Sequence, residues 1–548
     1  MAQASNRTAQ NGRMSFVVAA SAAGTVFEWY DFFIFGSLAA IIAKHFFASA
    51  GETQGYILAL LTFAAGFFAR PFGAIVFGRL GDRTGRKRTF LITITVMGLA
   101  TFIVGLLPDA RTLAAAPWVL VGLRVLQGFA IGGEYGGAAI YVAEHAHSGR
   151  RGLATGWIQL SASIGVILAL GVILGARRTL GEDAFADWGW RLPFLGSAIL
   201  LGISFWIRLR VDESPLFQRI RDEGQLAKAP LSEALFEWPN LKIVLIALVG
   251  VLMGQGVVWY MALFYTQFFL ERVLKLDPAT MNILVMAATV ATLPLYILLS
   301  WLSDKIGRKV LILAGLGAAA IMAFPAFHML TRAVNPALAE ASAKSPVIVV
   351  AEVSDCSVQF DLIGKAKYVT SCDIAKSSLT TLGIPYRNQA AAEGSFARVR
   401  VGTVEVENPD GRHRSDKDLV AAKADFNLRL KAALTGAGFP AKADPAKIDI
   451  PRALLVLILL GFAAAALYAP QAAALVELFP TRIRYTALSV PYHVGVGWFG
   501  GFLPATAFAI VAATGDIYAG LWYPVVVAAI GFFVSLLFLP ETFRRSIG

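Results

Sequence analysis

Two carboxylates stand inside the first long apolar segment of the chain, where a soluble protein has no reason to place them. Glu28 and Asp31 lie in GTVFEWYDFFIFG (24–36). They are three residues apart, so a helix presents them on one face. An ionisable group in a membrane span costs about 2.5–3.5 kcal/mol on insertion scales, so it usually faces a cavity or a partner. The pair is either neutralised by buried cations or carries a proton, and we predict a proton-coupling role for both residues.

A buried arginine follows in the second apolar segment. Arg70 occupies the middle of FFARPFG (67–73). It can form an ion pair with Glu28 or Asp31, or it can hold a substrate carboxylate through two parallel hydrogen bonds. The two roles are compatible if substrate and proton compete for the same guanidinium. We therefore predict that Arg70 binds substrate.

A polar stripe runs along the fourth apolar segment, RVLQGFAIGGEYGGAAIYVAEH (124–145). Arg124, Gln127, Ile131 and Glu134 step by three, four and three residues, which places them on one side of a helix. The glycines beside them favour close helix packing. A structural arginine alone does not need a glutamine and a glutamate aligned with it. We therefore predict that the stripe lines a central cavity, with Arg124 and Gln127 on the substrate and Glu134 as a third proton-coupling residue.

The second half of the chain carries fewer charges in its apolar segments. Its aromatic residues are typical of packing or of an interface belt. The polar residues that we predict to line the cavity and bind substrate are Gln255, Tyr260, Tyr468, Gln471 and His493.

The amino-acid composition indicates the kind of structure that positions these residues. Hydrophobic residues make up 57% of the chain and charged residues 15%, with a mean hydropathy of +0.64. A soluble domain has roughly 45–50% apolar and about 25% charged residues. The net charge of +12 lies in short loops and not on a basic domain, which argues for membrane orientation and against nucleic-acid binding.

Twelve segments are long and apolar enough to span a bilayer. We place them at about 16–43, 56–78, 89–107, 115–143, 152–174, 190–207, 241–270, 280–302, 310–330, 451–476, 485–513 and 518–539. Lys and Arg are concentrated on the side of the two termini, so we expect both termini in the cytoplasm of a multi-pass inner-membrane protein. The expected units are tails at 1–15 and 541–548, a first six-helix bundle at 16–209, a linker at 210–240, and a second bundle at 241–332 and 451–540.

One motif occurs twice. Residues 78–87 read GRLGDRTGRK and residues 300–309 read SWLSDKIGRK. Each copy separates two apolar segments. A charged turn that recurs once per half of a membrane protein indicates a two-half transporter.

Residues 333–450 interrupt the membrane pattern. Strand-like alternation at 396–407, a turn at 408–411 and a helical pattern at 416–434 predict a small inserted α/β domain. If the chain has twelve spans, the inserted domain lies on the extracytoplasmic side of the membrane, in the periplasm. Both cysteines, Cys356 and Cys372, fall inside it. They are either idle thiols or a disulfide worth about 3 kcal/mol, and we favour the disulfide. We predict no metal site, because two cysteines without a matching histidine pair give too few ligands.

These blocks resemble a known family. GTVFEWYDFFIFG, ARPFG, GRLGDRTGRKR, RVLQGFAIGGEYGGA, WGWRLPFLG (188–196), VDESPLF (211–217) and ELFPTRIRYTALS (477–489) are similar to the metabolite:proton symporters of the major facilitator superfamily, which include proline/betaine, α-ketoglutarate, shikimate and citrate carriers. The resemblance implies an all-α membrane protein of two six-helix bundles that rock around a central site. The insert departs from the family, whose members usually have a short loop there.

The resemblance also implies roles for the repeated motif. The aspartate of each copy is expected to hold the cytoplasmic side closed, at a helix N-terminus. The gating residues are Asp82, Arg83, Gly85 and Arg86 in the first copy, and Asp304, Lys305, Gly307 and Arg308 in the second. We also expect four glutamates near inner helix ends to lie at the interface or gate: Glu144, Glu213, Glu477 and Glu541.

The sequence thus predicts a proton-coupled symporter of a small organic acid or zwitterion. We expect no cofactor besides the proton, a monomer, and no partner beyond substrate and lipid. Two alternatives remain: a facilitator or exporter without proton coupling, and a transporter-like sensor that uses the insert. An enzyme is not expected, since the chain has no G-x-S-x-G, no Walker loop and no metal-binding spacing among its six histidines.

Overall fold

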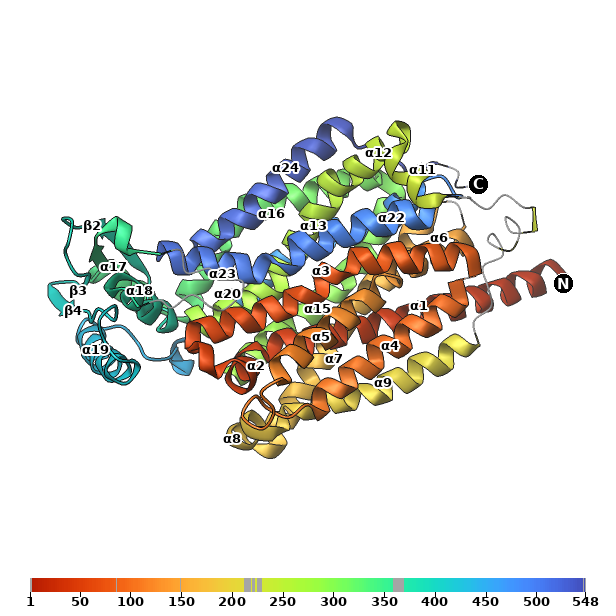
Figure 1. Cartoon of the computed structure of the whole chain (residues 1–548). Coiled ribbons are helices and arrows are strands. Elements are labelled where there is room, and N and C mark those ends of the chain that lie inside the picture. Colours follow the sequence, from red (N-terminus) through yellow and green to blue (C-terminus); the bar gives the residue numbers. More distant parts are fainter. Residues whose placement is uncertain are drawn as a thin grey trace.

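The computed structural model describes residues 2–84, 86–147, 149–210, 218, 222–223, 229–357, 369–545 and 547. The side chains of residues 2–17, 52–53, 81–84, 86 and 416 are outside this description. Within it, eleven helices are long and apolar enough to cross a membrane. A further pair, Val18–Ser37 and Ala39–Phe46, meets the same criteria when its two helices, bent by 62°, are taken together. The helices lie side by side in one elongated bundle (Figure 1).

The first half contains six spans. Its helices are α1 (Ala2–Ser37), α2 (Ala39–Phe46), α3 (Glu52–Thr84), α4 (Arg86–Leu106), α5 (Ala116–Ile131), α6 (Tyr135–His145), α7 (Arg151–Leu180) and α9 (Arg191–Leu209). The predicted first span thus bends near Ser37 instead of running straight. The predicted fourth span is divided into α5 and α6.

The second half is rich in π-helical turns. Its seventh span runs through α12 (Trp238–Leu245), η3 (Ile246–Leu252), α13 (Met253–Tyr260), η4 (Met261–Tyr265), α14 (Thr266–Phe268) and η5 (Phe269–Val273). The other spans are α15 (Pro278–Ile306), α16 (Arg308–Val334), α20 (Ile450–Tyr468) with α21 (Gln471–Leu478), α22 (Arg484–Tyr492) with η8 (His493–Gly500) and α23 (Leu503–Thr514), and α24 (Trp522–Phe538). The short helix α11 (Pro230–Phe236) precedes this half.

Contacts between the two halves are concentrated in a few helix pairs. α7 packs against α15, and α3 packs against α22 and η8. Within the first half, two close approaches bring α3 and α5 together. A Cβ placed on Gly128 would overlap the backbone carbonyl of Gly66, so only glycine permits this approach. The approach sets Arg70 of α3 and Arg124 of α5 on the same side, facing α1.

The insert is a four-stranded sheet with helices. Strands β1 (Val347–Ala351), β2 (Tyr386–Ala390), β3 (Arg398–Val401) and β4 (Val404–Glu407) lie in the order β2-β1-β3-β4. β1 and β2 are parallel and are connected through α18 (Ser371–Thr381), whereas β1, β3 and β4 are antiparallel neighbours. α17 (Pro336–Lys344) leads in, and α19 (Asp416–Gly436) follows the sheet. The alternation at 396–407 corresponds to the β3–β4 hairpin.

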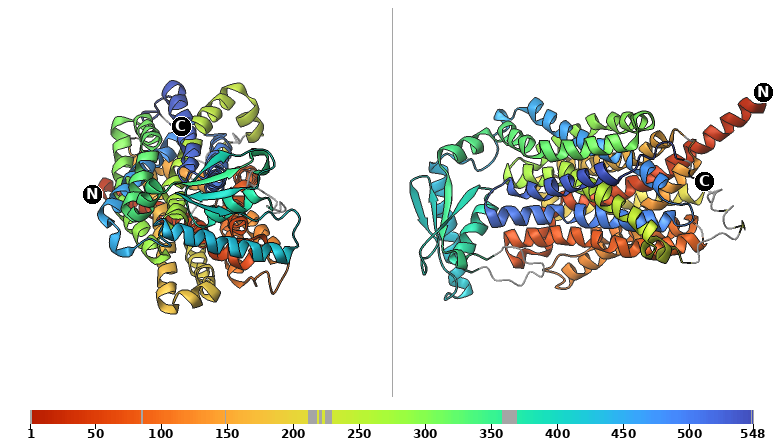
Figure 2. Two further views of the ribbon diagram at one scale, coloured as in Figure 1. Left: turned by 90° about the vertical axis from the view of Figure 1, so that its left-hand side faces the viewer. Right: turned by 90° about the horizontal axis from the view of Figure 1, so that it is seen from above.

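The insert covers one end of the bundle. It lies at the end opposite to the two chain termini (Figures 1 and 2). The segment between α16 and α20 is 335–449, within two residues of the predicted bounds. A disulfide joins Cys356 to Cys372 in the first turn of α18.

Candidate substrate and proton site

The first ion pair at the centre of the bundle joins α1 to α3. Arg70 Nη2 lies 3.4 Å from Glu28 Oε1, and both side chains are buried. The guanidinium lies 4.2 Å from the ring centroids of both Phe32 and Phe67. Among the described residues, no nitrogen of Arg70 has a hydrogen-bond partner. Arg70 is therefore held by charge and ring faces, and its donors are free for another acceptor.

The second ion pair is part of a hydrogen-bonded network. Arg124 Nη1 donates to Asp31 Oδ2 at 3.1 Å and to Gln127 Oε1 at 2.7 Å. Gln127 Nε2 donates to Asp31 Oδ1 at 3.1 Å, and Thr101 Oγ1 of α4 donates to the same oxygen at 2.8 Å. All four side chains are buried. We call these four residues, with Glu28 and Arg70, the central cluster.

Glu134 does not join this cluster through a continuous stripe. α5 ends at Ile131, and residues 132–134 form a turn before α6. Gly132 packs so closely on the α3 backbone that a Cβ there would overlap Arg70 O. Glu134 pairs instead with Arg208 near the end of α9. A turn at 132–134 thus interrupts the predicted stripe before Glu134, and Glu134 still packs against Gly24 of α1, the helix that Arg124 and Gln127 also contact.

Aromatic side chains from the two halves meet beside the central cluster. Trp29 and Trp259 have ring centroids 4.3 Å apart. Tyr260 lies 5.2 Å from Phe67, the ring beneath Arg70. Tyr135 stacks on Tyr492 at 3.8 Å. These contacts close the space between the halves at this level.

The five residues predicted in the second half are all buried, with exposures of 2% or less for Gln255, Tyr260, Tyr468, Gln471 and His493. The backbone carbonyl oxygen of Tyr468 accepts a hydrogen bond from Gln159 Nε2 of the first half at 3.1 Å. The ring of His493 lies 5.0 Å from that of Tyr492. Within the described chain, both polar atoms of the Gln471 amide and the Tyr260 hydroxyl have no hydrogen-bond partner. These groups can accept or donate to a ligand.

The second copy of the repeated motif closes the end that carries the termini. Asp304 accepts hydrogen bonds from the backbone N–H groups of Gly152 at 2.9 Å and Leu153 at 2.8 Å, at the start of α7. A carboxylate at a helix N-terminus is favourable because it meets unpaired N–H groups. Arg308 Nη2 lies 2.7 Å from Asp304 Oδ1. Gly307 has φ of 109°, which favours glycine, while Lys305 is exposed.

Glutamates extend this contact. Glu477 lies 3.2 Å from Arg308 Nη2 and 3.8 Å from Arg151 Nη1 of the first half. Arg484 pairs with Glu144 of the first half at 3.1 Å. We call this set the latch: Glu144, Arg151, Asp304, Arg308, Glu477 and Arg484. Outside it, Glu541 accepts from the backbone N–H of Arg308 and Lys309 at 2.9 and 3.1 Å.

The first copy of the motif can be compared only in part. Asp82 and Arg83 belong to the last turn of α3 and Arg86 begins α4, but their side chains, and all of Gly85, lie outside the described residues. Glu213 also lies outside them. Lys87 Nζ donates to Leu209 O at 2.9 Å. Lys309, its counterpart in the second copy, donates to Leu536 O at the same distance.

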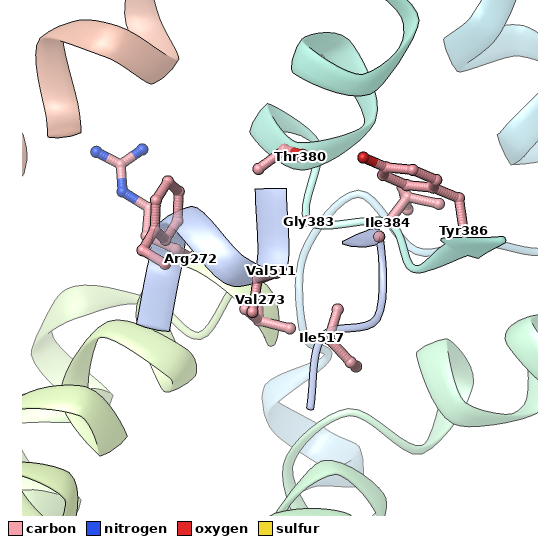
Figure 3. A pocket seen from close by; sticks show the side chains of 10 residues that line it. Arg272, Val273, Thr380, Gly383, Ile384, Tyr386, Val511 and Ile517 are labelled. Carbon is pink, nitrogen blue, oxygen red and sulfur yellow. The ribbon is translucent and has the colours of Figure 1, made fainter. Parts of the chain in front are cut away.

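The end beneath the insert is closed as well. The guanidinium of Arg272 lies 4.1 Å from the ring centroid of Tyr56, which also meets Phe268 and Phe508. A pocket separates the insert from the bundle, with Tyr386 and Ile384 on one side and Arg272 on the other (Figure 3). Tyr386 donates through its backbone N–H to Gly515 O and through its hydroxyl to Ala512 O, both at 2.9 Å. The buried central cluster thus lies between two ends at which contacts join the parts of the molecule.

Comparison with known proteins agrees with this arrangement. Residues 21–346 match the Major Facilitator Superfamily. The chain belongs to this superfamily. The match ends at Pro346, immediately before β1 of the insert. This member of the superfamily is a multi-pass membrane transporter and not an enzyme.

Relatives within the superfamily carry metabolites. The chain is 35% identical over 317 residues to the shikimate transporter of Escherichia coli K12, covering 57% of this chain and 71% of that one. It is 32% identical over 330 residues to the proline/betaine transporter of the same organism, covering 58% of this chain and 65% of that one. The resemblance to the metabolite:proton symporters is thereby confirmed.

The fold has solved counterparts. The structure of the proton:xylose symporter XylE bound to 6-bromo-6-deoxy-D-glucose aligns with a TM-score of 0.65 over 98% of both chains, at 16% identity. The nucleoside transporter NupG aligns with a TM-score of 0.51 at 12% identity. At these identities the likeness establishes the fold alone, and it confirms the predicted two-bundle architecture.

Three contributors to the site escaped the sequence analysis. Thr101 is one of several threonines in its span, and only the fold brings it to Asp31. Arg208 lies one residue beyond the predicted sixth span (190–207), although it is buried. Its position in the last turn of an apolar helix is the signal that could have marked it. Phe32, one turn beyond Glu28, could have been proposed as a ring surface for an arginine.

Proposed function

We propose that this transporter moves a small organic acid or a zwitterionic metabolite together with a proton, by alternating access around the central cluster. The observation that carries the proposal is the pair Arg70 and Glu28. The guanidinium has a charge partner at 3.4 Å but no hydrogen-bond acceptor within the described residues. A substrate carboxylate can supply that acceptor through two parallel hydrogen bonds.

Coupling follows from competition for Arg70. When Glu28 is ionised, it neutralises the guanidinium. When Glu28 takes a proton, Arg70 loses its counter-charge, and a buried unpaired charge is costly, so an anionic group is drawn to it. Substrate and proton then stabilise the same state, which is coupling by shared contacts. Arg124 and Asp31 form a second such pair, and Tyr260 and Gln471 supply neutral polar contacts.

The names of the relatives support this substrate class. Shikimate, proline and betaine all carry a carboxylate, and two of the three carry a positive nitrogen as well. We propose that both termini are cytoplasmic and that the insert is periplasmic, because Lys and Arg are concentrated at the end with the termini. The latch then closes the cytoplasmic side and the insert covers the periplasmic side.

Uptake into vesicles tests the proposal. Radiolabelled shikimate, proline and glycine betaine are offered at fixed external pH, with and without a protonophore. We expect at least one compound to accumulate above equilibrium and the accumulation to vanish with the protonophore. Uptake that only equilibrates and ignores the protonophore would identify a facilitator and leave Glu28 and Asp31 as structural partners of the arginines.

A further inference from the structure

A cavity at the end with the termini leads toward the proton-coupling residues. It is lined by side chains from α1, α4, α6 and α9, among them Ser21, Lys87, Tyr141 and Arg208. Arg208 forms its inner boundary, because its other face pairs with Glu134. One member of a buried ion pair therefore lines this cavity.

The ion pair with Arg208 engages only one of the two carboxylate oxygens of Glu134. Its Oε1 accepts from Arg208 Nη2. Its Oε2 is buried and has no hydrogen-bond partner among the described residues. A buried carboxylate oxygen without a donor can accept a proton at little cost in lost contacts. Arg208 also donates a hydrogen bond to the backbone carbonyl of Phe90 at 3.3 Å. This carbonyl remains as an acceptor for Arg208 when the guanidinium leaves Glu134.

Gly24 brings Glu134 close to Glu28. Gly24 of α1 packs directly against the pair, since a Cβ there would overlap both Arg208 Nη2 and Glu134 Oε1. Glu28 lies four residues further along α1, about 6 Å along the helix axis. Helical side chains lean toward the preceding turn, so Glu28 leans toward Gly24.

We propose that Glu134 is the proton exit site of the transporter, that Arg208 is its displaceable counter-ion, and that the cavity beside Arg208 is the water path to the terminus side. The step is a proton transfer. The O–H bond of protonated Glu28 breaks, an O–H bond forms on Glu134 as Arg208 turns to the cavity, and the proton then passes to water there. The other charged group lining the cavity is Lys87, which repels an arriving proton and favours its release.

This inference rests on the proposed proton coupling. Two assays distinguish a failure of the inference from a failure of the proposed function. Net accumulation of the radiolabelled compound identified among shikimate, proline and glycine betaine requires proton release in every cycle. Counterflow exchange of the same compound across preloaded vesicles requires only substrate binding and rocking. Glu134→Gln removes the proton acceptor and keeps the shape. We expect accumulation to fall to the equilibrium level while counterflow stays at the wild-type rate.

Two further variants sharpen the result. Arg208→Lys keeps the positive charge and should keep accumulation, whereas Arg208→Gln should lose accumulation and keep counterflow. Glu182→Gln is the matched control, because Glu182 also pairs with an arginine but is 58% exposed at the opposite end. A Glu134→Gln protein that accumulates substrate like wild type, or that loses accumulation and counterflow together, would overturn the inference. A wild-type protein without proton dependence would instead overturn the proposed function.

Water access is testable without transport. Both native cysteines are joined in a disulfide, so the protein has no free thiol. A Ser21→Cys variant therefore carries one reactive thiol, in the wall of the cavity. We expect a membrane-impermeant maleimide to label it from the side of the termini. Failure to label it from that side, with the protein inserted normally, would exclude the water path.

Discussion

Arg70 and Glu28 lie 3.4 Å apart at the centre of the bundle, yet Arg70 donates no hydrogen bond to any described residue. The two residues are thus joined by charge, without the geometry that would make the pair rigid. A pair of this kind is easily exchanged for a better acceptor. Arg124 differs, because it donates to both Asp31 and Gln127.

This difference predicts unequal effects of two substitutions. Arg70→Gln should lower uptake of a carboxylate substrate by about 10- to 100-fold, because a charged hydrogen bond contributes about 1.5–3 kcal/mol. The free energy of unfolding should fall as well, because the buried Glu28 carboxylate loses its counter-charge. Uptake by purified protein in vesicles measures the effect, and exposed Arg178→Gln is the control. Arg70→Gln uptake equal to that of the control would remove Arg70 from the substrate site.

Arg124→Ala should abolish uptake and also lower stability. The substitution leaves the buried Asp31 carboxylate without its cation, at a cost of about 3–5 kcal/mol. Membrane insertion should remain normal, since the span loses a charge. Thermal inactivation in detergent and uptake in vesicles are the two readouts. Wild-type uptake in this variant would show that Arg124 is not required at the site.

Thr101→Val should destabilise the protein by about 1–3 kcal/mol, because it removes a donor from a buried carboxylate. Thr95→Val is the matched control, since Thr95 lies in the same helix and donates only to the backbone of Leu91 among the described contacts. Thermal inactivation should separate the two variants. Equal stabilities would mean that Asp31 finds another donor.

The latch predicts a shift in conformational populations. Asp304→Asn weakens the contacts with Gly152 and Leu153 by about 1–2 kcal/mol and should favour the state open toward the termini. A Thr155→Cys thiol, buried in α7, should then react faster with maleimide from that side. Asp277→Asn is the control, because Asp277 caps α15 without joining the halves. An unchanged labelling rate would argue against a gating role for Asp304.

The disulfide predicts the stability of the insert. A Cys356→Ser, Cys372→Ser double variant should lose about 3 kcal/mol of stability in the insert on the chain-entropy account. Trypsin should then cut the insert faster in spheroplasts, in which the periplasmic face of the inner membrane is accessible to the protease. Reductant should accelerate cleavage of the wild type and leave the variant unchanged. Cleavage that responds equally to reductant in both proteins would exclude the disulfide as the cause.

Periodicity and charge predicted much of this fold. Long apolar runs specify spans because a bilayer leaves the backbone no alternative to a helix. The β3–β4 hairpin followed from alternation around Gly402. The three-residue spacing of Glu28 and Asp31 set both on one side of α1, and the spacing of Arg124 and Gln127 did the same on α5.

The partners of these residues required the fold. Spacing cannot say that Arg70 pairs with Glu28 and Arg124 with Asp31, because that depends on how α3 and α5 approach α1. The turn at Gly132, which packs on the α3 backbone, and the pairing of Glu134 with Arg208 likewise depend on neighbouring helices that spacing along one helix does not specify. The burial of Arg208 also required the fold, because the neighbouring helices determine whether a helix end is buried.

Lys87 and Lys309 each bridge a motif helix to the last helix of the same half, and neither bond crosses between the halves. Contacts of this kind survive when the halves separate, whereas the bonds from Asp304 to α7 do not. A movement of one half against the other would therefore leave these two contacts unchanged. The same movement would have to break the latch, the Tyr56 contacts and the central aromatic pairs, which join the halves.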